Sequence, residues 1–158
     1  GCLTMRLTWG MPMQEWIGRV CANLILMTSL SFSMPASAQQ KDSDVCFEGS
    51  GQEAIAACTR RISQATGNNL ATVYHSRGYE YMKLRQFDMA IADFTQSIRV
   101  NSSYINPYVN RCLCYRGKGE FAKAVADANS ALRIAPNDRE ARICLERAQQ
   151  RIPYPAPD

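Results

Sequence analysis

Apolar residues recur at helical spacing between Tyr74 and Ile98 and predict two helices joined by a short turn. Tyr74, Tyr81 and Leu84 fall on one stripe, because gaps of seven and three residues match the 3.6-residue period of a helix. The polar pair at residues 85–86 forms the predicted turn. The apolar face of the second helix consists of Phe87, Ala90, Ile91, Phe94 and Ile98.

The same pattern returns 34 residues further along the chain, as a second predicted hairpin. Residues 124–132 repeat residues 90–98, and Tyr108 repeats Tyr74. The glycine-rich residues 117–119 make the second turn. The second apolar stripe consists of Phe121, Ala124, Val125, Ala128 and Leu132. Self-similarity at one fixed period is the sequence signature of a helical-repeat protein.

These two units resemble the tetratricopeptide repeat, a helix–turn–helix of the same length. The residues that match its signature are Tyr74, Gly78, Tyr81, Ala90, Phe94 and Pro136. The residues that depart from it are Arg77, Arg111, Cys112, Ala128 and Ser102. The resemblance implies an all-α fold, a right-handed superhelix of antiparallel helix hairpins with about six helices. It places the two repeats at 71–104 and 105–138.

The segments on either side extend this architecture. Residues 54–62 align with the second helix of the first repeat at an offset of 36, which predicts a degenerate half-repeat helix at 52–70. We expect residues 39–51 to be an extended segment before it. A polar helix at 139–151 is expected to cap the stack, because terminal repeats need a polar outer face. Three prolines within 152–158 predict a disordered tail.

The N-terminal region has the three parts of a secretory signal peptide. Arg19 gives a basic flank, an apolar run continues to Phe32, and residues 36–38 give a small-residue ending. We therefore expect residues 1–38 to be a signal peptide. The protein would then be exported by a bacterium of the Gram-negative type and be periplasmic or secreted.

An uncleaved membrane anchor is the alternative interpretation of these residues. The strongly apolar part ends near Phe32, which is short for a bilayer span of about 20 residues. Membrane association is therefore expected only if the segment is not cleaved. Because the chain begins with Gly1, translation could start at a later methionine, and residues 1–10 could be an artefact.

Charge and composition narrow the range of functions. The chain has 18 basic and 14 acidic residues, which are interspersed, and its formal net charge of +4 does not indicate a nucleic-acid partner. Its one histidine is His75. The sequence supplies no recognisable nucleophile or second acid–base group to accompany it, so we expect no catalytic residues, no enzyme activity and no cofactor.

Five cysteines follow the predicted signal peptide, and export to an oxidising compartment would allow them to pair. Cys46 could fold back and bond Cys58 on the half-repeat helix. The segment from Val45 to Thr59 also resembles the start of exported repeat proteins from alphaproteobacteria, and we expect a Cys46–Cys58 disulfide. The alternative is two free thiols, one of them buried. Because five is odd, at least one thiol stays free or pairs between chains.

The sequence Cys112-x-Cys114 is not expected to bind a metal. Zinc sites use a spacing of two to four residues between paired cysteines, and side chains two apart on a helix point about 200° apart. Cys112 is interpreted as a core residue. Cys114 could reach Cys144 on the capping helix, because first helices of successive repeats lie side by side in the family that these repeats resemble.

In that family the first helix of each hairpin lines a concave groove that accepts a peptide or a partner helix. Transferred by position, the groove residues are Thr72, His75, Ser76, Tyr79, Met82, Lys83, Asn106, Val109, Asn110, Leu113 and Arg116. Chaperone co-factors of the family hold a partner's C-terminal carboxylate in a clamp. Of the corresponding positions only Asn110 fits, and Glu140 would repel a carboxylate, so we expect no carboxylate clamp.

The sequence therefore predicts a non-catalytic adaptor or scaffold that binds another protein or a peptide in the periplasm or outside the cell. The alternative is a structural protein whose repeats stack on copies of themselves. In that homo-oligomer, the odd thiol could link two chains.

Overall fold

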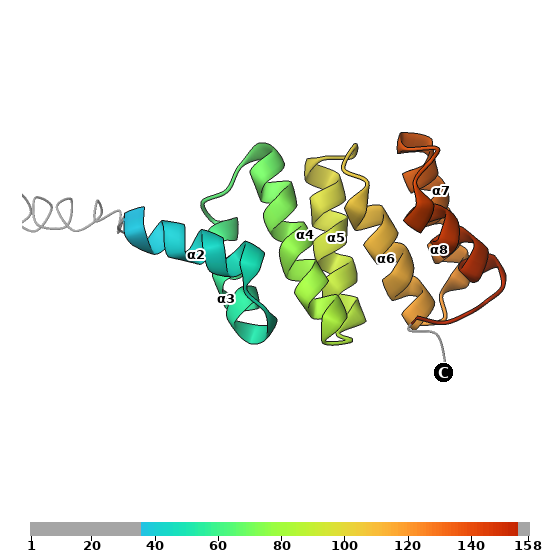
Figure 1. The fold of residues 1–158 in the computed structure, drawn as a ribbon, viewed down its shortest axis with the longest axis horizontal. Helices are drawn as coiled ribbons and strands as arrows, with labels where there is room; N and C mark the ends of the chain where they lie inside the picture. The colour runs from blue at the N-terminus through green and yellow to red at the C-terminus, as the bar shows by residue number, and fades with distance from the viewer. Residues whose placement is uncertain (1–35, 155–158) are drawn as a thin grey trace, which may run out of the picture. The chain divides into compact units, whose positions relative to one another are not determined.

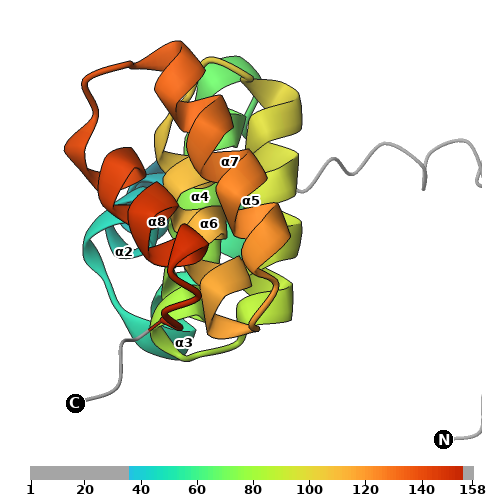
Figure 2. The ribbon, with the colours of Figure 1, turned by 90° about the vertical axis from the view of Figure 1, so that its right-hand side faces the viewer.

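The computed structural model describes residues 36–154, which fold into seven helices and contain no strand (Figure 1). The helices are α2 (Ala36–Glu48), α3 (Gly51–Ile62), α4 (Gly67–Lys83), α5 (Phe87–Val100), α6 (Asn106–Gly117), α7 (Phe121–Ile134) and α8 (Arg139–Gln149). They form successive hairpins, and α8 packs on α6 and α7 at the end of the stack (Figure 2). Within residues 36–154 no helix is long and apolar enough to span a bilayer. The predicted signal peptide lies outside the described residues, except for residues 36–38.

Helix α2 corrects the prediction that residues 39–51 are extended. Residues 39–48 belong to a 13-residue helix that packs on α3, so α2 and α3 form a complete hairpin in place of a half-repeat. The one buried residue of α2 is Cys46, which lies in a cluster with Cys58 and Val73. Because α2 buries only this one residue, its sequence shows no apolar stripe at helical spacing. A helix of this kind is stabilised by its contacts with neighbouring helices.

A glycine allows the two helices of the next hairpin to approach closely. A Cβ atom on Gly78 would lie 2.9 Å from Cε1 of Phe94, so no larger residue fits without moving this ring. Phe94 is fully buried and packs with Met82, Ala90 and Cys114. This cluster forms the core between α4, α5 and α6.

Helices α4, α6 and α8 all end in the same way. Each is followed by a residue with positive φ, Arg85 at 58°, Gly119 at 74° and Arg151 at 57°. The next backbone N–H then donates to a carbonyl oxygen in the last turn, as from Gln86 to Tyr81 at 2.9 Å. This left-handed ending satisfies free carbonyl groups and reverses the chain.

Two disulfides join helices within the described residues. Cys46 is bonded to Cys58, which is the expected pair. Cys144 is bonded to Cys112, so the predicted Cys114–Cys144 pairing is wrong. Cys112 faces α8, whereas Cys114 points into the core between α4, α5 and α6, because residues two apart lie on different faces of a helix. Cys114 is a buried free thiol, which argues against the odd cysteine linking two chains.

Residues 152–154, which we call the C-terminal strap, fold back under the repeats, and the prediction of a disordered tail is wrong there. The buried guanidinium of Arg116 donates through Nε and Nη2 to the carbonyl oxygens of Ile152 and Pro153, each at 2.9 Å. Tyr154 packs against the core between α4 and α5. The strap therefore ties the residues that follow α8 to α6 and to the core between α4, α5 and α6.

Candidate functional site

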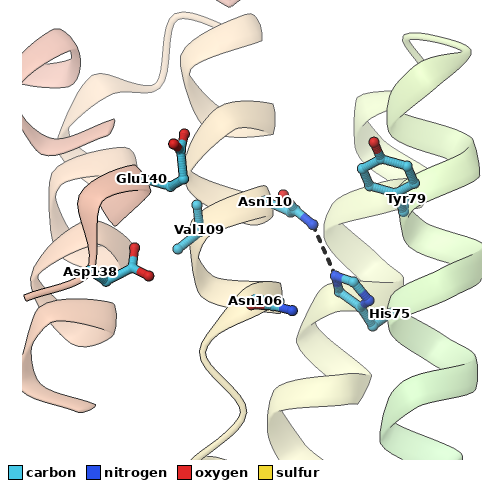
Figure 3. Close-up of a pocket in the computed structure, with 7 residues that line it drawn as sticks. All are labelled: His75, Tyr79, Asn106, Val109, Asn110, Asp138 and Glu140. Atoms are coloured by element: carbon cyan, nitrogen blue, oxygen red, sulfur yellow. Dashed lines mark hydrogen bonds between the residues drawn. The ribbon is translucent and has the colours of Figure 1, made fainter. Parts of the chain in front are cut away.

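A pocket of about 340 Å³ lies between α4, α6 and the start of α8 (Figure 3). Its lining residues are His75, Tyr79, Asn106, Val109, Asn110, Asp138 and Glu140. All come from the first helices of successive hairpins or from the residue that caps such a helix. Helix α6 contacts both α4 and α8, and this places the three groups of side chains around one cavity.

Local helix geometry positions each group of side chains. His75 and Tyr79 are four residues apart and therefore project from the same face of α4. Asn106 and Asn110 have the same spacing on α6, with Val109 beside them. These residues form the α4 and α6 sides of the pocket.

Two carboxylates from the start of α8 form the remaining side. Asp138 is the N-cap of α8, and its Oδ1 accepts a hydrogen bond from the backbone N–H of Ala141 at 2.7 Å. Glu140 lies in the first turn of the same helix and is exposed. Within residues 36–154 neither carboxylate takes part in an ion pair.

A hydrogen-bond network fixes the wall of the pocket. The amide nitrogen of Asn110 lies 2.9 Å from Nε2 of His75 (Figure 3). On the other side of the ring, the Tyr104 hydroxyl lies 3.1 Å from Nδ1. Because an amide nitrogen only donates, we assign Nε2 as the acceptor and the ring proton to Nδ1, which donates to the hydroxyl oxygen. The network joins α4, α6 and the loop between α5 and α6.

Burial keeps this network neutral at physiological pH. It lowers the pKa of His75 to about 4 and raises the pKa of Tyr104, since a low-dielectric environment disfavours the charged form of each group. The His75 ring packs among aromatic rings, with centroids 5.1 Å from Tyr104 and 5.7 Å from Phe94. His75 therefore contributes hydrogen bonds and shape to the pocket, and no positive charge.

Two of the predicted groove residues do not face a groove. Met82 is 5% exposed and belongs to the core cluster with Phe94. Arg116 is 1% exposed and binds the C-terminal strap. Position within the repeat does not reveal the partners of Arg116, because the strap lies outside the repeat pattern.

The other predicted groove residues divide into two sets. The five that line the pocket are His75, Tyr79, Asn106, Val109 and Asn110. The four that lie outside its lining are Thr72, Ser76, Lys83 and Leu113. Asp138 and Glu140 complete the site but were not among the predicted groove residues. Asp138 is the last residue of the second repeat. Glu140 lies two residues beyond it, and the comparison with the carboxylate clamp had already named this position.

Within residues 36–154 no group of three or more histidine, cysteine, aspartate or glutamate side chains is arranged to hold a metal ion. The polar groups of the pocket are amides, carboxylates and one neutral imidazole. These groups can donate and accept hydrogen bonds and attract a cation.

Comparison with known proteins gives the class of fold. Residues 71–104 and 105–138 each match the sequence model of the tetratricopeptide repeat, at the predicted boundaries. In the structure the first helix of the first repeat begins earlier, at Gly67. The chain therefore carries two tetratricopeptide repeats within a longer stack of helix hairpins.

Solved structures of tetratricopeptide-repeat domains have the same fold. The domain of Arabidopsis OM64 superposes with a TM-score of 0.63 and 21% identity, over 73% of this chain and 94% of that domain. The second such domain of human RPAP3, solved with the HSP70 peptide SGPTIEEVD, gives a TM-score of 0.62 and 24% identity, over 72% and 92%. The described helices thus form an all-helical superhelix of this type.

Sequence relatives match part of this chain and a small part of their own length. Mouse serine/threonine-protein phosphatase 5 is 27% identical over 92 residues, which cover 58% of this chain and 18% of that protein. Rat sperm-associated antigen 1 is 30% identical over 94 residues, which cover 60% of this chain and 10% of that protein. The chain spans less than a fifth of the length of either relative.

Proposed function

We propose that this protein is a non-catalytic adaptor that binds a polypeptide segment in the pocket between α4, α6 and α8. The observation that supports this most directly is the composition of the pocket wall. Tyr79 is 43% exposed and offers an aromatic face, and Val109 adds apolar surface beside it. The amides of Asn106 and Asn110 can bond a peptide backbone, which needs one donor and one acceptor per residue.

The network around His75 supports the same proposal. The side chain of Asn110 is held at 2.9 Å by the imidazole, which is itself held by Tyr104. One amide hydrogen and the amide oxygen of Asn110 remain free to meet a ligand. A recognition group that is already oriented loses less conformational freedom on binding.

The segment bound here should differ from the peptide in the RPAP3 complex. That HSP70 peptide, SGPTIEEVD, carries three acidic residues at its C-terminal end. The pocket of this protein presents Asp138 and Glu140 and has no lysine or arginine in its lining. A peptide with an acidic end would be repelled, since like charges at close range are unfavourable.

Export to an oxidising compartment is part of the proposal. The apolar run and small-residue ending within residues 1–38 support it. So do the disulfides Cys46–Cys58 and Cys112–Cys144, because such bonds persist mainly in secreted and periplasmic proteins. N-terminal sequencing of the protein recovered from the periplasm or medium tests this part: cleavage after residue 38 gives a start at Gln39, and a start upstream of it would contradict the prediction.

Affinity capture from a periplasmic extract, followed by mass spectrometry, tests the binding function. The parent protein should retain a specific partner, and a Tyr79→Ala, Asn110→Ala double variant should lose it. Met89→Ala is the matched control, because Met89 is 52% exposed but lies on α5, outside the pocket. Thermal melts of all three proteins verify folding, and undiminished capture by the double variant would remove the binding site from this pocket.

A further inference from the structure

The pocket has an uncompensated negative charge. Its lining contains two carboxylates and no lysine or arginine. Of the neighbouring cations, Lys83 pairs with the Glu80 carboxylate at 2.9 Å. Arg142 donates to the carbonyl oxygen of Asn137 at 3.1 Å, and Arg139 is exposed and lies outside the lining. His75 adds no charge near neutral pH. A group that enters this pocket therefore meets Asp138 and Glu140, neither of which forms an ion pair within residues 36–154.

The charged and apolar groups of the pocket lie on different sides. Asp138 and Glu140 project from the start of α8, whereas Tyr79 projects from α4 on the opposite side (Figure 3). Val109 on α6 lies next to the carboxylates, and the two asparagines lie between them and α4. The ligand side chain that matches this order has an apolar stem and a positively charged end.

Lysine and arginine have this form. Their methylene stems pack on apolar and aromatic surface while the charged end remains solvated or paired. An aromatic face also attracts a cation directly, and Lys83 already shows this at the edge of the site, with Nζ 5.8 Å from the centroid of the Tyr79 ring. An apolar side chain would cover the carboxylates without pairing them, which is unfavourable.

We propose that the polypeptide segment bound in this pocket carries a lysine or arginine whose charged end pairs with Glu140 and Asp138 and whose stem packs against Tyr79 and Val109. This inference rests on the proposed function and specifies the chemistry of its ligand. One oxygen of Asp138 caps α8, so Glu140, with both oxygens free, provides the main contact.

A random twelve-residue peptide library displayed on phage, selected on the immobilised full chain, tests the inference. The selected peptides should share a lysine or arginine at one position. A synthetic copy with blocked termini is then compared with versions in which norleucine or glutamate replaces that residue. Norleucine keeps the stem and removes the charge. Fluorescence anisotropy should show binding about three- to tenfold weaker for norleucine, with a smaller effect of salt, and weaker still for glutamate.

Variants of the protein locate the contact. Glu140→Gln should weaken binding of the lysine peptide by about three- to tenfold and leave binding of the norleucine peptide unchanged. Glu146→Gln makes the same change of charge on α8 outside the pocket and should have no effect. Because the comparison of lysine with norleucine uses the parent protein, the test does not depend on the folding of any variant.

The outcomes distinguish this inference from the function on which it rests. In one outcome the lysine and norleucine peptides bind equally well, and the Tyr79→Ala, Asn110→Ala double variant binds neither. This result would overturn the inference of a positively charged ligand and retain the pocket as the binding site. Selected peptides that bind in spite of both alanines, or a selection that yields no peptide, would overturn both proposals.

Discussion

Arg77 holds the carboxylate of Asp93 with two hydrogen bonds, Nε to Oδ2 and Nη2 to Oδ1, both 2.7 Å long. The pair joins α4 to α5. The remaining Nη1 of Arg77 donates to Thr59 Oγ1 on α3, at 2.9 Å. The same arrangement recurs one repeat later in Arg111, Asp127 and Thr95. Each arginine therefore connects its own hairpin to the one before it.

The second of these pairs gives a prediction about stability. Asp127→Ala should lower the free energy of unfolding by about 3 kcal/mol, because it leaves the largely buried guanidinium of Arg111 without its counter-ion. Thr95→Val removes one neutral partner and should cost only about 1 kcal/mol. Urea unfolding measures both. In a double-mutant cycle, Arg111→Met with Asp127→Ala should cost clearly less than the sum of the single variants, and simple additivity would contradict the pairing.

The contact between Gly78 and Phe94 gives a second prediction. Gly78→Ala should destabilise the protein by about 1–3 kcal/mol, since the new methyl group would overlap the ring. Phe94→Ala should cost about 3–5 kcal/mol through the cavity that it leaves. In a Phe94→Leu background the Gly78→Ala change should cost less, because the smaller side chain makes room. An equal cost in both backgrounds, measured by urea unfolding, would contradict this packing.

The left-handed helix endings predict a stabilising substitution. Arg85 adopts a φ of 58°, which glycine occupies without strain. Arg85→Gly should therefore raise the free energy of unfolding by up to about 1 kcal/mol. The equivalent residue of the next repeat is already Gly119, with a φ of 74°, so Gly119→Ala should lower stability by a similar amount. Thermal melts that shift in the same direction for both variants would contradict the shared turn.

Burial of His75 predicts a loss of stability in mild acid. The folded protein keeps the ring neutral down to a pKa of about 4, whereas the unfolded chain protonates it near 6.5. The contribution of the neutral ring is complete above about pH 6.5 and falls as the pH approaches 4, by up to about 3 kcal/mol. His75 is the one histidine of the chain. Urea unfolding between pH 7 and 4.5 should show a smaller decline for His75→Gln than for the parent.

The cysteine arrangement predicts a labelling pattern. Alkylation of the non-reduced protein in denaturant, followed by peptide mapping, should modify Cys114 and leave the four bonded cysteines of the described region unmodified. Without denaturant Cys114 should not react, because it is buried and its thiol pKa is raised to about 12. Replacing Cys112 and Cys144 by alanine should cost about 3–4 kcal/mol, since their bond closes a long loop. A labelled Cys144 would contradict the observed pairing.

Much of the fold could be predicted because the repeat period imposes strong local signals. The spacing of Tyr74, Tyr81 and Phe94 defines the helices and their turn before any contact is known. Arg77 and Arg111 showed only as departures from the signature, because their partners lie on other helices. Helix α2 was not predictable in this way, since it buries a single cysteine and has no apolar stripe.

The site was only partly predictable for a related reason. Position within the repeat named the residues that line the α4 and α6 sides of the pocket, among them Tyr79 and Asn110, together with others that lie outside its lining. The acidic wall comes from the start of α8. The comparison with the carboxylate clamp pointed to Glu140, but no pattern in the sequence marked Asp138 as a pocket residue. The burial of Arg116 depends on residues that follow the last helix, and no helical periodicity extends that far.

The C-terminal strap determines where an attached group would be held. Because Arg116 binds Ile152 and Pro153, the backbone carbonyl of Tyr154 lies beside Gly117, at the end of α6. A fluorophore attached at residue 154 would therefore report on the hairpin of α6 and α7, although the residue follows α8 in the chain.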